Sequence, residues 1–262
     1  MYFPLRRETL SLIEQMGYYT YTIILFTIFY ILTISNAQNV TQFQGFKVSC
    51  RDTSPECLKR SLQEVYPEFI HGIPELGITS LDPFAVDSLV LKLPGELTLE
   101  FKDAYAKGLQ KCNVDYIRLI EEYNLDIQFN CNLLTKGKYR STGRLFMFPI
   151  DGEGLSTIIS RNLKIRWNIQ FSSITKDEGQ KYIQIKNLKT SHSFEGRVTY
   201  NMTNLFKGNA DMSKVALDFM NENWYMVANE LGSPLINYCI NLIISNLNQL
   251  LNKVPLNNLI ST

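Results

Sequence analysis

Histidine is scarce in this chain, and the sequence patterns of common enzymes are missing from it. The two histidines, His71 and His192, lie far apart, and no cluster of further ligands accompanies them to make a zinc site. There is no Gly-x-Ser-x-Gly nucleophile elbow of the kind that hydrolases use. The carboxylates are scattered along the chain. We therefore predict a protein that is not an enzyme and that holds no metal and no cofactor.

An excess of charge of either sign is also missing. The 26 basic residues balance 25 acidic ones, which gives a formal net charge of +1. Binding to nucleic acid or to an anionic membrane depends on a strongly basic face, so neither partner is expected. Low-complexity tracts, linkers and short repeats are absent from the sequence too. This pattern favours a single domain after the N-terminal segment.

Long uncharged apolar stretches are limited to residues 18–34. Arg6 and Arg7 precede this stretch, and Ala37 follows it as a small residue at the position expected for cleavage. These are the features of a secretory signal peptide. The stretch also approaches the roughly 17 residues that can just span a bilayer, so an uncleaved signal anchor is the alternative.

We predict that residues 1–37 form a signal peptide and that residues 38–262 form the secreted, extracellular domain. Export leads to an oxidising compartment, where the five cysteines are potential disulfide partners. Two sequons, at Asn39 and Asn201, are compatible with glycosylation on this route.

The first structured element expected after the leader is a helix over residues 54–71. Ser54 is a natural N-cap, Pro55 suits the first helical position and Gly72 ends the pattern. Pro67 lies inside this span, and a proline there removes a backbone hydrogen bond. The last turn is therefore predicted to be kinked or broken.

From about residue 81 to residue 206 the apolar period changes to two. Leu97, Leu99 and Phe101, for example, alternate with Thr98 and Glu100. Such alternation is typical of half-buried antiparallel strands with one face toward water. An antiparallel sheet is expected over this part of the chain.

A long helical segment is expected over residues 213–253. Its predicted apolar stripe begins at Val215 and Phe219 and continues through Leu242. Pro234 should kink or split this helix near residue 232. About 40 residues of helix would measure roughly 60 Å, and a domain of this size accommodates such a rod if the sheet wraps along it.

Four stretches of the chain, taken in order, resemble the insect takeout and juvenile-hormone-binding family of secreted carriers. The stretches are the Cys50 and Cys57 pair with its helix, residues 72–84 (GIPELGITSLDPF), residues 143–154 (GRLFMFPIDGEG) and residues 204–209 (NLFKGN). A weaker match, FMNENW at residues 219–224, leads into the last helix. The resemblance extends over about residues 46–260.

The resemblance implies an α+β fold, in which a strongly curved antiparallel β-sheet wraps around a long C-terminal α-helix, with a short N-terminal helix. The domain would be elongated, with an internal hydrophobic tunnel. It also implies a secreted carrier that binds and transports an elongated small hydrophobic ligand, either a terpenoid such as juvenile hormone or a fatty-acid-like molecule. The resemblance suggests a role in hormone titre, feeding, chemosensation or clock-controlled physiology, and the residues do not choose among these. We expect a monomer, and the role is compatible with an unidentified receptor or protein partner.

The resemblance further implies that Cys50 pairs with Cys57, a short loop worth about 2–3 kcal/mol of stability. Cys112 and Cys131 are equidistant from Glu121–Glu122. If strands over residues 109–120 and 123–134 form a hairpin centred there, these two cysteines face each other and could form a second bridge. Without that hairpin they remain thiols. Cys239 is expected to be a buried, inert thiol.

Candidate ligand contacts follow from strand parity and from the helix stripe. For each, plain core packing is the competing interpretation, and for His192 it is a histidine that is satisfied by the protein or solvated. The candidates on the strands are Tyr139, Leu145, Met147, Trp167, Ile169, Phe171, Ile183, Ile185, His192, Val198 and Tyr200. Those on the helix are Phe219, Trp224, Val227, Leu231 and Leu235.

Three other functions stay open at this level. A secreted protein-interaction module would have a core filled by its own side chains. A signal-anchored lipid-handling protein would keep its leader. A weak hydrolase would turn over model esters.

Overall fold

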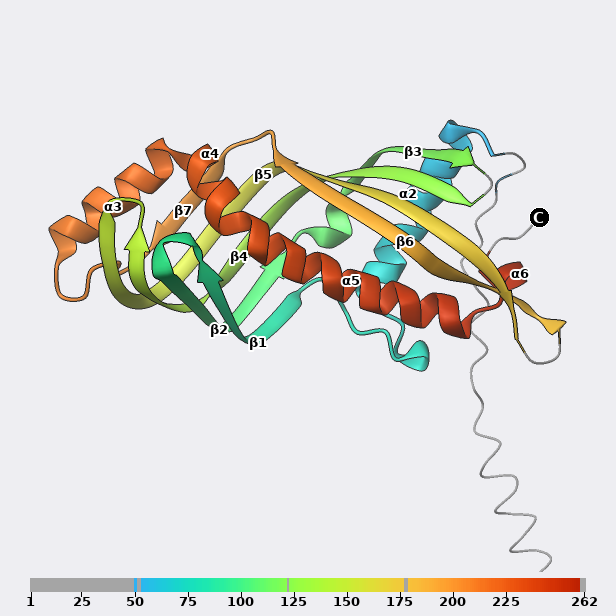
Figure 1. Cartoon of the computed structure of the whole chain (residues 1–262), viewed down its shortest axis with the longest axis horizontal. Coiled ribbons are helices and arrows are strands. Elements are labelled where there is room, and N and C mark those ends of the chain that lie inside the picture. The colour runs from blue at the N-terminus through green and yellow to red at the C-terminus, as the bar shows by residue number, and fades with distance from the viewer. Residues whose placement is uncertain (1–49, 51–52, 122, 177–178, 260–262) are drawn as a thin grey trace, which may run out of the picture. The chain divides into compact units, whose positions relative to one another are not determined.

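The computed structural model describes residue 50 and residues 53–121, 123–176 and 179–259. The predicted signal peptide and the Asn39 sequon lie outside these residues. In the described part, helices flank a seven-stranded antiparallel sheet (Figure 1). The strands are β1 (Phe84–Leu93), β2 (Leu97–Lys107), β3 (Asn113–Glu121), β4 (Asn124–Leu145), β5 (Phe148–Thr175), β6 (Lys181–Phe194) and β7 (Val198–Met202). The helices are α2 (Pro55–His71), α3 (Ala210–Glu222), α4 (Trp224–Val227), α5 (Ser233–Lys253) and α6 (Leu256–Leu259).

Strands β4 and β5, of 22 and 28 residues, form the centre of the sheet. They pair from Asn124 opposite Gln170 to Leu145 opposite Phe148, which leaves a two-residue turn. The order of strands is β1-β2-β4-β5-β6, with β3 also on β4 and β7 also on β5. Each strand of the central β4–β5 hairpin therefore pairs with two further strands. The predicted curved antiparallel sheet with a long C-terminal helix is confirmed.

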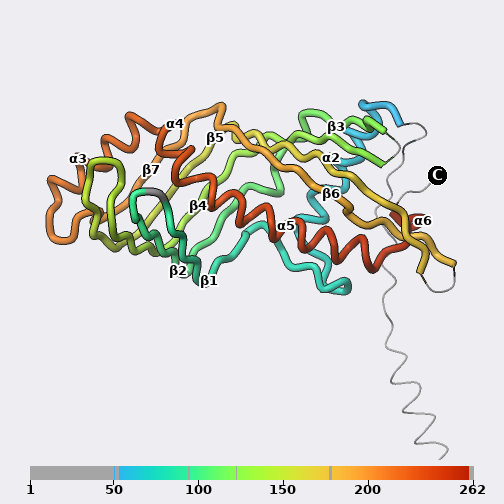
Figure 2. The backbone as a smooth tube through the Cα atoms, in the orientation of Figure 1, coloured from blue at the N-terminus to red at the C-terminus, as the bar shows by residue number. Residues whose placement is uncertain are grey.

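Bulges bend the long strands. The β4–β5 register shifts between Cys131 and Leu133, where Asn162 takes a positive φ of 49° and its backbone N–H donates to Asn132 Oδ1 at 2.9 Å. A bulge bends its strand and increases its twist. It also changes which residues face inward, because the inward set on β5 passes from Ile158 and Ser160 to Leu163 and Ile165. The backbone trace in Figure 2 shows the resulting curvature of β4 and β5.

Helix α2 begins and ends where the sequence predicts. Ser54 Oγ accepts a hydrogen bond from Cys57 N, and Gly72 follows the last turn with φ of 95°. The expected break at Pro67 is wrong, because the helix continues to His71. Tertiary contacts hold the last turn: Ile70 is completely buried, and its carbonyl accepts from Leu81 N at 2.8 Å.

The disulfide that the resemblance implies and the possible second one are both present. Cys50–Cys57 has a Cα–Cα distance of 5.7 Å and Cys112–Cys131 one of 4.4 Å. The hairpin that justified the second bridge exists, but β3 starts only at Asn113, since residues 109–111 form a 3₁₀ turn. Cys239 is a free thiol, half-buried.

The C-terminal helical segment is not the single helix with one break that the sequence predicts. It is interrupted at Asn223, and a π-helical turn, Ala228–Gly232, precedes α5. Within α3 and α5 the buried face also differs from the predicted stripe by one residue: Val215 and Leu242 are exposed, and Ala216 and Ile243 are buried instead. Asn246 of α5 is buried, and its side-chain amide donates to the carbonyl of Thr79 at 2.9 Å.

Two of the family-like stretches, residues 143–154 and 204–209, pack against each other. Asp151 bridges to Phe206, and Lys207 N donates to Asp151 O at 2.9 Å. A Cβ on Gly152 would lie 2.4 Å from the carbonyl oxygens of Asn204 and Leu205. Glycine is therefore required where the two backbones meet, because any side chain would separate them.

Asp126 joins three strands on the outer face of the sheet. Its fully buried carboxylate accepts from Arg118 at 2.7 Å and from Arg166 at 2.8 and 2.9 Å. The hydrogen bonds from Arg166, together with those from Arg118, outweigh burial and lower the pKa of Asp126. The carboxylate is thereby held in its charged form, which links β3, β4 and β5.

We expect Asp126→Asn to lower the free energy of unfolding at pH 7 by about 1–3 kcal/mol, because charge-assisted hydrogen bonds are lost in a buried position. A lowered native pKa stabilises the fold above the unfolded value of about 3.9, and this contribution is lost as pH falls through the native pKa. Urea unfolding of both proteins should show a gap that closes toward pH 3. Asp103→Asn, which removes an exposed pair with Lys138, is the control and should change little. A gap that stays constant with pH would contradict the role of Asp126.

Candidate functional site

An apolar cavity lies between the inner face of the sheet and the C-terminal helices. It contains about 120 Å³ of free volume. A single buried water needs about 10–15 Å³ on this measure, so the space corresponds to roughly ten non-hydrogen atoms. A smaller void of about 20 Å³ adjoins it under β1 and shares Phe101, Leu235 and Cys239 with it. Well-packed interiors contain few such voids, so a cavity of this size marks a candidate binding site.

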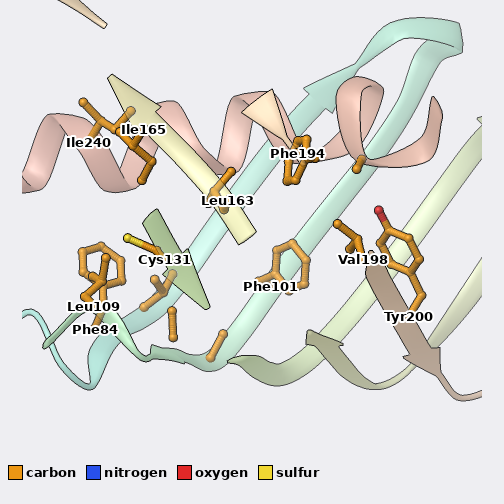
Figure 3. Close-up of a cluster of buried hydrophobic side chains, with 14 of the residues drawn as sticks. Phe84, Phe101, Leu109, Cys131, Leu163, Ile165, Phe194, Val198, Tyr200 and Ile240 are labelled. Atoms are coloured by element: carbon orange, nitrogen blue, oxygen red, sulfur yellow. The ribbon is translucent and has the colours of Figure 1, made fainter. Parts of the chain in front are cut away.

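The cavity wall comes from strands β2, β4, β5, β6 and β7 and from the helical segment. Figure 3 shows Phe101, Leu163, Ile165 and Phe194 on the strands with Ile240 on the helix. The wall on the sheet and its connections consists of Leu97, Leu99, Phe101, Ala106, Leu109, Leu133, Thr135, Ser141, Leu145, Ile150, Ile158, Ser160, Leu163, Ile165, Phe194, Val198, Tyr200, Met202 and Leu205. The helical side consists of Met220, Ala228, Leu231, Gly232, Leu235, Ile236, Cys239, Ile240 and Ile243.

Five of the sequence-predicted contact residues are in this wall. They are Leu145, Val198, Tyr200, Leu231 and Leu235. Leu145 is the last residue of β4, Val198 and Tyr200 lie on β7, and the last two come from the π turn and α5. Whether a ligand touches them stays a prediction.

Tyr139 and Met147 lie elsewhere. Tyr139 is buried on the inner face, but its hydroxyl donates to the carbonyl of Thr203 at 2.8 Å. Met147 is 68% exposed, because β4 ends at Leu145 and the methionine lies in the turn before β5. Met147 has the same parity as Leu145, and residues 145–148 are all apolar, so parity alone could not reveal that the strand had ended.

The predicted residues on β5 and β6 are on the expected face but outside the cavity wall. Trp167 and Ile169 are buried, and Phe171 is half-buried. Trp167 packs edge-to-face on Phe129 with ring centroids 5.7 Å apart. Ile183 and Ile185 are half-buried on β6. These side chains fill space, and the wall ends before them on β5.

His192 is satisfied by the protein. Its Nε2 lies 3.1 Å from Ser233 Oγ, and its ring meets Phe194 edge-on. Burial lowers the pKa of His192, which favours the neutral ring. Since Ser233 Oγ also donates to Asn229 O, the ring nitrogen acts as the donor to Ser233. The pair joins β6 to α5 beside the cavity.

The three remaining helical candidates pack outside the wall. Phe219 contacts Phe148, with centroids 5.2 Å apart, and Trp224 lies edge-on to Tyr225. Val227 is completely buried without reaching the cavity. Met220 and Ala228, each one position further along the chain than a predicted residue, line it instead.

Sequence reasoning missed most of the β2 and β5 wall. Leu97, Leu99 and Phe101 showed the period of two plainly, so the signal for an inward face was present. The sequence did not show which face of the sheet the helix covers. No sequence pattern marked Ala106 and Ala228 as wall residues, because these small side chains contribute to the cavity only by leaving space.

Two ionisable side chains belong to the wall, and burial keeps both neutral. It raises the pKa of the Tyr200 hydroxyl, and it raises the pKa of the Cys239 thiol to about 12. A thiol with so high a pKa is a poor nucleophile, as expected for Cys239. Among the described residues, no group of three or more His, Cys, Asp or Glu side chains is placed to hold a metal ion.

Comparison with known proteins gives the family. The sequence profile described as Haemolymph juvenile hormone binding protein matches residues 27–261. The chain belongs to this family. Proteins named circadian clock-controlled protein daywake, from Drosophila melanogaster and Drosophila yakuba, are each 24% identical to it over 200 residues, covering 72% of this chain and 76% of theirs.

A crystal structure of takeout 1 from Epiphyas postvittana has the same fold. It superposes with a TM-score of 0.76 at 26% identity, covering 80% of this chain and 97% of that one. The predicted resemblance to the takeout and juvenile-hormone-binding family is confirmed. No helix within the described residues is long and apolar enough to cross a membrane.

Because the Tyr139 hydroxyl bonds to Thr203 rather than facing the cavity, we expect Tyr139→Phe to act on stability alone. Loss of one buried hydrogen bond should lower the free energy of unfolding by about 0.5–1.5 kcal/mol. Binding of an apolar fluorescent probe should be unchanged. Tyr225→Phe, at an exposed position, is the control for both measurements. Weaker probe binding in Tyr139→Phe alone would place Tyr139 in the site.

Proposed function

We propose that this protein carries a small hydrophobic ligand inside the cavity between the sheet and α5. The supporting observation is the cavity itself: its wall is almost entirely apolar, in a chain that belongs to the haemolymph juvenile hormone binding protein family. The function is sequestration and transport through an aqueous fluid, without catalysis. Clock control, named for the two daywake relatives, is a further proposal for this chain.

Binding would draw its energy from removing apolar surface from water. The gain is about 25 cal/mol for each Å² of apolar surface buried, less the cost of ordering ligand and wall. A ligand of roughly ten non-hydrogen atoms fits the present free volume. A longer terpenoid requires side chains such as Phe101, which lies between the two voids, to move.

We propose also that the protein is secreted after removal of residues 1–37. Two disulfides support this, since such bonds persist in oxidising compartments. Asn201 of the second sequon has an exposed side chain on β7, as an attached glycan requires.

Filling the cavity should abolish binding. Leu235 of α5 lines both voids, so Leu235→Trp places an indole in the space that a ligand would occupy. We expect the affinity for N-phenyl-1-naphthylamine, a neutral fluorescent probe, to fall at least tenfold. Leu242→Trp makes the same change on an exposed face of the same helix and should leave affinity unaltered.

Titration of the purified secreted protein, with circular dichroism of each variant as a folding check, gives this result directly. Equal probe affinity in the wild type and Leu235→Trp would show that binding occurs elsewhere. A wild type that binds neither the probe nor any extractable lipid would support the interaction-module alternative.

Secretion predicts a defined N-terminus. Protein collected from the medium of insect cells should begin at Gln38 and lose mass on treatment with a glycosidase that releases N-glycans. Asn201→Gln should remove part of that loss, because the glycan on the exposed asparagine is gone. Protein that keeps residues 1–37 and stays with the membranes would identify a signal anchor instead.

A further inference from the structure

Five apolar side chains form a continuous surface where the turn between β4 and β5 meets α3. Phe146 and Met147 are the turn residues, and Met212, Val215 and Phe219 lie on α3. The rings of Phe146 and Phe219 have centroids 5.9 Å apart, which joins the two elements. Phe219, Val215 and Met212 are separated by helical spacings of four and three residues, so they share one face of α3. We call these five residues the apolar tip.

The apolar tip is exposed although its side chains are large. Met147 is 68% exposed, Val215 52%, Met212 38% and Phe146 37%, and Phe219 is half-buried. Together these side chains present roughly 400 Å² of apolar surface to water. An exposed apolar patch of that size on a monomeric protein often marks an interaction site.

The turn itself does not require apolar residues. Phe146 has a positive φ of 53°, a backbone conformation that bulky side chains rarely adopt. Two-residue turns between paired strands favour asparagine, aspartate and glycine, which tolerate such backbone angles at lower cost. A polar pair would therefore close this hairpin at least as well as phenylalanine and methionine do. Folding alone does not account for these two side chains, which points to a role at the surface.

The shape and the area of the apolar tip favour a lipid surface over a second protein. Met147 projects from the end of the domain, because the paired strands stop at Leu145 and Phe148. The roughly 400 Å² of the tip is about half of the 800 Å² or so that each partner contributes to a stable protein complex. A bilayer needs no matching concave surface, and its binding strength increases with the apolar area that enters it.

The charges beside the apolar tip are of both signs. Arg144 precedes the turn, Asp211 is adjacent to Met212, and Lys214 pairs with Asp218 on the same helix. The whole chain has a formal net charge of only +1. Neither the tip nor the chain therefore favours an anionic surface. The lipid surface that fits is zwitterionic, as phosphatidylcholine is.

The apolar tip also adjoins one end of the cavity. Leu145 and Ile150, on either side of the turn, line the cavity, and so does Met220, the residue after Phe219. Figure 1 shows α3 at one end of the described domain, far from α6. A bilayer in contact with the tip would therefore face the cavity across a thin layer of side chains.

We propose that the apolar tip docks on a zwitterionic phospholipid bilayer, and that the ligand passes between bilayer and cavity at this end. The docking stands on the exposed surface alone, whereas the transfer step rests on the proposed carrier function. Phe146 and Met147 would enter the boundary between head groups and acyl chains, together with the apolar face of α3.

Vesicle flotation tests the docking. Secreted protein is mixed with phosphatidylcholine vesicles, and the fraction that floats with them gives the affinity. We expect Met147→Glu and Val215→Glu each to lower this affinity at least tenfold, because each places a charge in the apolar contact. Leu155→Glu is the matched control, since it introduces the same carboxylate at a β5 residue that is 62% exposed outside the apolar tip. It should leave the affinity unchanged, and so should added salt.

Probe transfer tests the second step. Protein loaded with N-phenyl-1-naphthylamine is mixed with empty phosphatidylcholine vesicles. Transfer by contact has a rate that increases with vesicle concentration, whereas release into water has a constant rate. We expect the wild type to show the concentration dependence and Met147→Glu to lose it. The equilibrium affinity of Met147→Glu for free probe should stay at the wild-type value, because Met147 does not line the cavity.

The outcomes separate the docking from the carrier function, with circular dichroism as the folding check for each variant. Equal vesicle affinity in the wild type, Met147→Glu and Leu155→Glu would overturn the docking. Probe binding without vesicle affinity would also overturn it and leave the carrier function standing. Vesicle binding without probe binding would support the docking and count against the carrier function.

Two further results would count against parts of the proposal. A wild-type transfer rate that is independent of vesicle concentration would overturn the transfer step alone. Self-association of the wild type that Met147→Glu abolishes, in the absence of vesicle binding, would assign the apolar tip to a contact between two copies of the chain. Analytical ultracentrifugation of both proteins measures this.

Discussion

The antiparallel pairing of β4 with β5 is the interaction on which the remaining structure depends. It runs from Asn124 opposite Gln170 to Leu145 opposite Phe148, and every other strand of the described sheet is hydrogen-bonded to one of these two or to their neighbour β2. Asp126 reinforces it on the outer face through Arg118 and Arg166. On the inner face the same two strands present the apolar side chains that α5 covers. A bulge at Asn162 bends the pair, so a curved sheet faces a straight helix.

Curvature and small side chains together leave the cavity. The wall includes three small residues on β2 and the π turn, Ala106, Ala228 and Gly232. Gly232 also packs closely against Phe194, since an added Cβ would lie 2.8 Å from the Phe194 ring. Protein interiors normally pack without large voids, because the atoms that line a void lose dispersion contacts. Here the rigid backbone ladder and the helix keep the walls apart, and this gives the family's ligand-binding fold its physical basis.

Much of the fold was predictable because its signals are local. The Ser54 cap, the Gly72 stop and the alternation over β2 and β7 require only neighbouring residues. The Cys112–Cys131 bridge was predictable once a hairpin was assumed, and Asn113 opposite Asn130 confirms the required register. The site was harder. Met147 shares the parity of its strand after the strand has ended, and on α3 the buried residue is Ala216 rather than the neighbouring Val215 of the predicted stripe.

The sequence by itself determined the class of structure, the limits of α2, the faces of most strands and the family, because capping, alternation and motif order are properties of short segments. Only the tertiary structure decided which inward residues meet empty space and which meet one another. Tyr139 and Tyr200 illustrate the difference: both are buried tyrosines on inward positions, yet one hydroxyl reaches the carbonyl of Thr203 and the other ring lines the cavity. That choice depends on where bulges bend the sheet and where the helix shifts phase, and both are settled by packing between segments that are distant in the chain.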